Sequence, residues 1–156
     1  MSAKSQFLKK LQTRHTVPSA FKSQSEADVA AFRYQMEQLL EQMSDWVADT
    51  GLQAETANAS VSDLLVEGGT FSISAILVRH EERTIKFTPL FLYGHGVTGC
   101  VEITLHTSGK ARPLGRLFMR TGNTKGWSSI LDSDPSRSTC IFDEETFFNV
   151  IENLLP

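Results

Sequence analysis

The chain has 156 residues, a hydrophobic fraction of 40% and a charged fraction of 21%, proportions that are typical of a globular domain and exclude a wholly disordered or fibrous protein. Its net charge of −3 and pI near 5.8 exclude the overall basic excess that most nucleic-acid binders show. No apolar run approaches the roughly 18 residues that a membrane-spanning helix needs, so we expect one domain that does not enter a bilayer.

The first segment, residues 1–25, carries five Lys or Arg and no acid. Its lysines are not followed by the apolar block of a secretory signal, which predicts a cytoplasmic protein. We therefore expect a basic, flexible N-terminal arm followed by a single domain over residues 26–156. The Ser-rich, acid-free composition also resembles an organelle transit peptide, which is the alternative.

A long amphipathic helix is predicted over residues 26–49. Its apolar residues recur at spacings of three and four: Val29, Phe32, Met36, Leu39, Met43 and Trp46. Ser25 is the predicted N-cap, and Gly51 is the predicted left-handed residue after the helix. The repeat is also compatible with a coiled-coil seam, but a helix that packs on the protein's own sheet is favoured.

One flank of this helix carries a carboxylate at every fourth residue: Glu37, Glu41, Asp45 and Asp49. Like charges at this spacing repel one another weakly. The row is therefore either a solvated face or a docking strip for a basic partner protein, because an acidic surface steers association and contributes to specificity. No metal site is predicted, because no second source of ligands accompanies the row.

Segments with strand character alternate with turn residues over the rest of the chain, and an antiparallel sheet of five or six strands is predicted. The predicted strands are Val61–Val66, Phe71–Arg79, Thr84–Leu92, Cys100–His106, Leu114–Arg120 and Trp127–Leu131. Strict alternation places Phe71, Ile73, Ala75, Leu77 and Arg79 on one face of the second strand and Ser72, Ser74, Ile76 and Val78 on the other. This strand is therefore expected to begin half-buried and to become more apolar.

A short closing helix follows, with Asp143 as its predicted N-cap and Phe147, Val150, Ile151 and Leu154 as its apolar stripe. The predicted fold class is therefore α+β: a long N-terminal amphipathic helix, an antiparallel meander and a short C-terminal helix.

Basic residues gather between Glu102 and Asp132, where the sequence has no acid: Lys110, Arg112, Arg116, Arg120 and Lys125. If Leu114–Arg120 is a strand, Arg116, Phe118 and Arg120 share a face. An arginine, aromatic, arginine row, with Trp127 nearby, suits phosphates and a stacked base. The favoured interpretation, however, is that these bases pair with the acids of the helices and shield an edge strand.

A glycine-rich loop contains Gly94, His95 and Gly96, whose backbone N–H groups suit the approach of an anion. The loop is not a P-loop, and His95 is a lone candidate for a general base. Cys100 and Cys140 lack the spacing of zinc ligands and are expected to be buried, reduced thiols. No catalytic residue, metal or cofactor is predicted.

The leading hypothesis from the sequence is a small, intracellular, non-enzymatic protein-interaction module that neutralises, escorts or adapts a partner through its charged surface. The alternative is a binder of an anionic ligand or single-stranded nucleic acid, which is less favoured, and an enzyme using His95 is the third hypothesis. A homodimer stays open.

Overall fold

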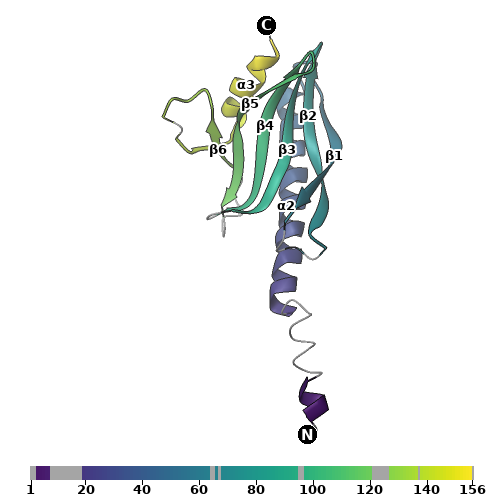
Figure 1. Cartoon of the computed structure of the whole chain (residues 1–156). Helices are drawn as coiled ribbons and strands as arrows, with labels where there is room; N and C mark the ends of the chain where they lie inside the picture. The colour runs from purple at the N-terminus through teal and green to yellow at the C-terminus, as the bar shows by residue number, and fades with distance from the viewer. Residues whose placement is uncertain are drawn as a thin grey trace.

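A computed structural model of the chain describes residues 3–7, 19–63, 66, 68–94, 97–120, 127–136 and 138–155, with the backbone alone for residues 19–23 and 120. It confirms the α+β class: a long helix, a seven-stranded antiparallel sheet and a short C-terminal helix (Figure 1). The elements in chain order are α2 (Ser19–Val47), β1 (Ala54–Ser62), β2 (Thr70–His80), β3 (Arg83–Gly94), β4 (Val97–Thr107), β5 (Lys110–Arg120), β6 (Ser128–Leu131), β7 (Cys140–Ile141), α3 (Glu144–Ile151) and the 3-10 turn η1 (Glu152–Leu154).

Helix α2 buries the predicted apolar stripe except for Trp46, which is half-buried, and Phe32 and Met43 are fully buried. The helix is longer than predicted, because it begins at Ser19 and not at residue 26. Ser25 is therefore not an N-cap but a buried residue within the helix. A serine can cap a helix only where the backbone leaves the helical conformation. The sequence between Pro18 and Gly51 contains no glycine or proline that would interrupt the helix at Ser25. Gly51 has the predicted left-handed conformation, with φ +84°.

The seven strands follow one another as a meander, in the order β1 to β7. Tight turns join β2 to β3 and β4 to β5, where Glu81 (φ 55°), Ser108 (φ 44°) and Gly109 (φ 82°) take the positive φ values that short hairpins require. The hairpins confirm the antiparallel prediction, and the strand count is slightly higher than the predicted five or six.

The first strand does not lie where the sequence pattern placed it. It covers Ala54–Ser62 and not Val61–Val66, and only Val61 of its side chains is buried. Its other residues are small or polar, so hydrophobicity gave little signal, and the strand is held by its backbone ladder with β2. The two-residue strand β7 was also not predicted.

Strand β2 separates from β3 part way along its length. It pairs with β3 only from Ile76↔Phe87 to His80↔Arg83, although it pairs with β1 along its whole length. The β2–β3 ladder stops two residues before Pro89, which has no N–H to donate, and β3 has an irregularity against β4 at the same place.

This separation changes which side chains of β2 are buried in the core. Phe71 and Ile73 join the core in the first half, whereas Ile76 and Val78 join it in the second half. Ala75 and Leu77 are buried as well, so β2 begins half-buried and is buried on both faces further along, as its sequence predicted. The physical reason for this change of face is that a two-stranded ribbon twists more strongly than a strand held on both sides.

Both helices lie on the same face of the sheet, behind it in the view of Figure 1. Aromatic contacts join the two helices and the sheet: the ring centroids of Trp46 and Phe147 are 5.2 Å apart, and those of Phe87 and Phe147 are 6.5 Å apart. No described helix covers the opposite face, which we call the outer face. Within the described ranges, no helix is long and apolar enough to cross a membrane.

Candidate partner-docking surface

The acidic flank of α2, which we define as Glu37, Glu41, Asp45 and Asp49, is fully on the solvent side of the molecule. All four side chains are exposed, and none forms a hydrogen bond or ion pair with another described residue. Three of them lie on α2 itself, and Asp49 lies in the turn that follows Val47. The structure therefore leaves this negative charge available at the surface.

The flank does not run straight along the helix. Four residues of an α-helix turn through about 400°, so each carboxylate is rotated by about 40° from the one before it. Glu37 lies on the side of α2 nearest β1. Glu41, Asp45 and Asp49 lie progressively further round the solvent side of the helix. A partner that contacts the whole flank must therefore cross the helix obliquely.

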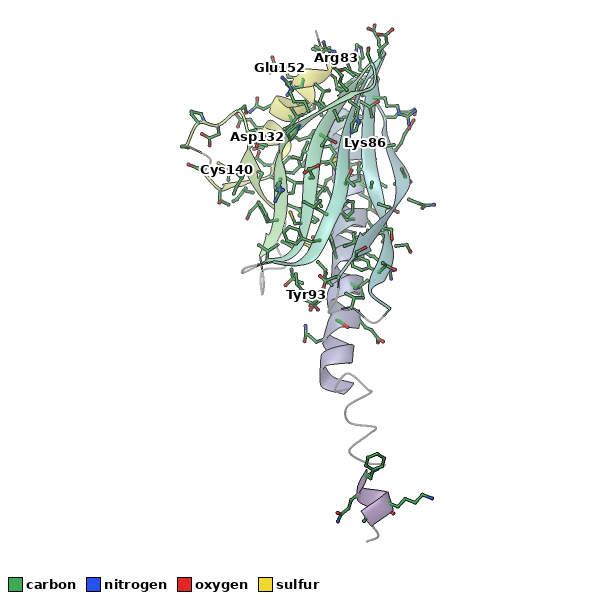
Figure 2. The ribbon with its side chains drawn as sticks, viewed as in Figure 1. Arg83, Lys86, Tyr93, Asp132, Cys140 and Glu152 are labelled. Carbon is green, nitrogen blue, oxygen red and sulfur yellow. The ribbon has the colours of Figure 1, made fainter. Side chains whose placement is uncertain are left out.

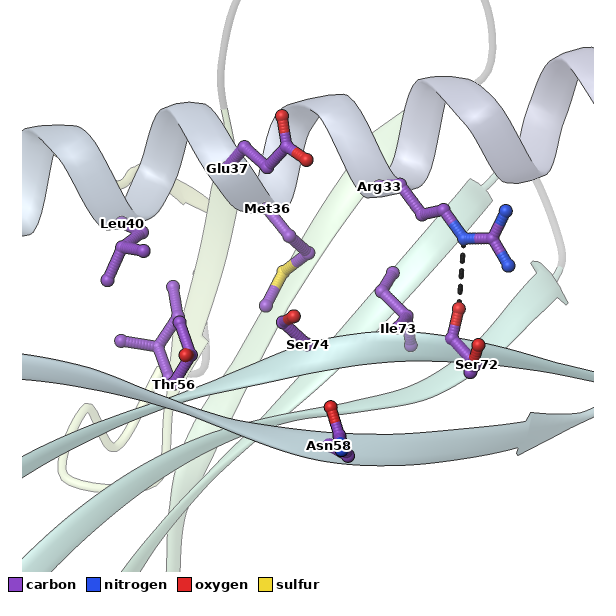
Figure 3. Close-up of a pocket in the computed structure, with 10 residues that line it drawn as sticks. Arg33, Met36, Glu37, Leu40, Thr56, Asn58, Ser72, Ile73 and Ser74 are labelled. Atoms are coloured by element: carbon purple, nitrogen blue, oxygen red, sulfur yellow. Dashed lines mark hydrogen bonds between the residues drawn. The ribbon is translucent and has the colours of Figure 1, made fainter.

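A hollow of about 210 Å³ lies between α2 and the β1–β2 hairpin, on the side where Glu37 is found (Figure 3). Polar side chains from both strands line it, together with an apolar floor: Thr56, Asn58, Ser72 and Ser74, with Met36, Leu40, Ile73 and Ile76. Figure 3 shows Glu37 on the helix rim of this hollow, with its carboxylate turned away from the strands.

Arg33 is the second charged residue at this hollow, but its guanidinium is already engaged. Its Nε donates to the backbone oxygen of Ser72 at 2.9 Å, and its guanidinium carbon lies 5.9 Å from the centroid of the Phe71 ring. Arg33 therefore fastens α2 to β2, and Glu37 is the charged group left to meet a partner.

The predicted cationic residues do not form one patch. Arg116 and Phe118 lie together on the outer face, beside a hollow of about 580 Å³ that Glu102 and Asp132 also line. Glu102 is the cross-strand partner of Arg116, so two carboxylates offset the cation there. Six residues along β5 separate Lys110 from Arg116, a distance of about 20 Å.

Arg112 is turned to the other side of the sheet, where its guanidinium donates to Oδ1 of Asn153 at 3.2 Å. The side chain of Arg120 and all of Lys125 lie outside the described residues. Of the five predicted bases, the structure thus places only Arg116 beside Phe118.

Trp127 does not join Phe118, which corrects the sequence-based expectation. It is 4% exposed and belongs to the core, where its ring centroid is 6.1 Å from that of Phe32 on α2. The reason is that Trp127 immediately precedes β6 and falls on the face that α2 covers, a placement that depends on tertiary packing and that the sequence spacing does not show.

The predicted glycine-rich loop is only partly described. Gly94 ends β3, and a Cβ atom at this position would approach the Phe91 ring to 2.5 Å. A larger residue at this position would require the Phe91 ring to shift. His95 and Gly96 lie outside the described residues, so the candidate general base has no described geometry.

Three titratable groups on the strands of the sheet have shifted pKa values, and burial is the first cause of each shift. Burial raises the pKa of the Cys100 thiol to about 11, whereas Cys140 is exposed, which corrects the expectation that both thiols are buried. Burial, and then the charge of Lys86, lower the pKa of His106. Burial, and then a hydrogen bond to Asp28, raise the pKa of Tyr93.

These shifts do not assemble a catalytic group. His106 contacts the hydroxyl of Thr104 at 2.9 Å, and a high thiol pKa makes Cys100 a poor nucleophile near neutral pH. Within the described ranges, no three His, Cys, Asp or Glu side chains are grouped as metal ligands.

Two features of this surface were missed from the sequence. One is the open edge of β1, for which the alternation of small polar residues with Ala57, Ala59 and Val61 was the available signal. The other is the bond from the Tyr93 hydroxyl to Oδ2 of Asp28, at 2.6 Å, which joins β3 to α2 near the lower end of the sheet in Figure 2. A contact 65 residues apart in sequence gives no local signal.

Comparison with known proteins returned no match to a family model, to a curated protein or to a solved structure.

Proposed function

We propose that the protein is a non-enzymatic protein-interaction module that docks a partner of basic surface through the acidic flank of α2. The observation that carries the proposal is the exposure of all four carboxylates without a described partner. Unneutralised charges of one sign on a rigid element steer a partner of opposite charge and suppress wrong partners.

The rigidity of α2 also supports this role. Its apolar stripe is buried along its length, and Arg33 fastens its side to β2. A surface on a packed helix is preorganised, so little conformational entropy is lost when a partner binds.

The test is affinity capture from the source cell with quantitative mass spectrometry, comparing the wild type with Glu41→Lys plus Asp45→Lys. We expect the reversed pair to lose its partner by at least about tenfold, because like charges at an interface are strongly unfavourable. The matched control is Glu82→Lys plus Glu152→Lys, which changes net charge equally at two exposed positions that are not part of the flank. Retention of every partner by the folded flank variant would refute the proposal.

Binding of an anionic ligand or single-stranded nucleic acid is the second candidate, favoured by the adjacency of Arg116 and Phe118 on the outer face. Phosphate contacts release counterions, so such binding must weaken as salt rises. Oligonucleotide binding that falls with salt and is lost in Arg116→Gln would favour this candidate over a protein partner.

A further inference from the structure

Strand β1 is an edge strand that is open along its whole length. It pairs with β2 on one side over all nine residues, and among the described residues nothing hydrogen-bonds to its other side. Figure 1 shows β1 at the right-hand margin of the sheet with no described element beyond it. At about 3.3 Å per residue, this edge presents roughly 30 Å of unpaired backbone donors and acceptors.

The opposite edge of the sheet, by contrast, is protected by its shortness, because β7 has two residues. Natural edges are otherwise blunted by Lys, Pro or a bulge. Strand β1 contains no Lys, Arg or Pro, and its register with β2 is uninterrupted. Its one charged residue, Glu55, lies 3.7 Å from the Arg79 guanidinium on β2. An edge this long and this regular is a template for a further strand.

We propose that β1 receives an extended segment of the partner as an eighth strand, and that a basic side chain of that segment lies against Glu37. This inference rests on the proposed function and specifies how the partner engages. The backbone ladder of β1 supplies affinity, and the alternate side chains of the added strand supply specificity.

The charges around the edge identify a basic segment as the occupant. Arg33 is engaged with Ser72 and Phe71, and Glu55 is beside Arg79. The charged side chain left at the hollow beside this edge is therefore Glu37. Side chains of an added strand that lie next to Thr56 and Asn58 reach the rim of the hollow where Glu37 is found.

A second copy of the chain is a poorer occupant. Antiparallel pairing of two β1 strands about a two-fold axis keeps both α2 helices on the same face of the joined sheet. The two acidic flanks would then lie on the same face of the joined sheet, and their like charges oppose such pairing.

The first test uses the full chain and a library of synthetic nonapeptides as the probe. We expect the selected peptides to alternate β-branched with other residues and to contain a Lys or Arg. Replacing that basic residue by norleucine should weaken binding to the wild-type protein by about tenfold. The same replacement should weaken binding to the Glu37→Gln variant much less, because that variant has already lost the charge pair. Failure to select any peptide, or selection without a basic residue, would overturn the inference.

The second test separates backbone pairing from side-chain contacts. In an extended peptide, neighbouring N–H groups face opposite sides. Two peptides are compared, one N-methylated at the odd positions and the other at the even positions, and only one of these two patterns removes the donors that face β1. We expect one pattern to abolish binding and the other to leave it within about threefold. Equal behaviour of the two patterns would contradict strand addition.

The third test alters β1 itself with Ala57→Pro and, separately, Asn58→Pro. Neighbouring N–H groups in a strand point to opposite sides, so one proline removes a bond to β2 while the other removes a donor from the open edge. The variant that retains the wild-type melting temperature should lose the peptide by at least about tenfold. Unchanged affinity of this folded variant would overturn the inference.

Two outcomes separate this inference from the proposed function. If Glu41→Lys plus Asp45→Lys loses the cellular partner but the folded β1 proline variant keeps it, the partner docks on the flank and strand addition is refuted. If native mass spectrometry shows a wild-type dimer that the proline variant abolishes, the occupant is a second copy, and the basic segment is likewise refuted.

Discussion

Asp143 shows what a single residue contributes to this fold. Its Oδ1 accepts hydrogen bonds from the backbone N–H and the hydroxyl of Thr146, both at 2.9 Å, at the start of α3. These bonds lower the pKa of the Asp143 carboxyl, with the backbone bond as the larger cause. This residue could be predicted from sequence because an N-cap contacts its own chain three residues later.

We expect Asp143→Ala to lower the melting temperature, because an N–H at the start of α3 loses its acceptor. Asp143→Asn keeps an acceptor and should melt close to the wild type. Because the pKa of Asp143 is lowered in the folded protein, its carboxylate stabilises the fold at pH values above the aspartate pKa of the unfolded chain, about 3.9. This stabilisation is lost as the pH falls below that value. Thermal melts between pH 7 and pH 2 test this, and an alanine variant as stable as the asparagine variant would contradict it.

Burial at other residues could not be predicted in this way. Ser25 and Trp127 have the local sequence of a helix cap and of an exposed aromatic side chain, yet both are buried. Their burial depends on which residues approach them from distant parts of the chain, and a single sequence contains no direct signal for such an approach.

Among the elements, α2 and α3 were predictable because their apolar residues repeat with the helical period. The start of α2 was not, because serines are compatible with both a cap and a helix interior. Strand β1 was misplaced in the prediction because it is held by backbone hydrogen bonds to β2 and buries little apolar surface. A strand with few buried apolar side chains lacks the hydrophobic pattern from which strands are predicted.

The separation of β2 from β3 leaves the end of β3 paired with β4 on one side only, and contacts with α2 and the β1–β2 connection lie on the other side. Tyr93 provides both: its hydroxyl donates to Asp28, and its backbone N–H donates to Oδ2 of Asp63 at 3.3 Å. These two hydrogen bonds lie beyond the point where the backbone pairing of β2 with β3 ends.

We expect Tyr93→Phe to reduce the free energy of unfolding by about 1 kcal/mol, the usual loss for one hydrogen bond. Tyr34→Phe, at an exposed position on α2, is the matched control and should change little. Because the Tyr93 pKa is raised, its stabilisation is complete below the unfolded value of about 10 and is lost as pH rises further. Urea unfolding at pH 7 and at pH 10.5 tests both statements, and equal effects of the two substitutions would contradict them.

At the scale of the whole molecule, the acidic row on the long helix and the group of bases between Glu102 and Asp132 were visible in the sequence, but their arrangement in space was not. The acidic flank stays on the solvent side of α2, whereas the bases that were expected to act together are divided between two faces of the sheet. The two helices cover one face only, so the molecule presents three distinct surfaces: the acidic flank, the open edge of β1 and the outer face.

The central claim is that a protein partner occupies the first two of these surfaces. Hydrogen exchange of the full chain, alone and in the complex captured from the source cell, tests this most directly because it reports backbone protection residue by residue. We predict slower exchange of β1 amides that face away from β2, together with protection along residues 37–49, and unchanged exchange in β4 and β5. Protection confined to β4 and β5, with β1 exchanging as in the free chain, would contradict the account.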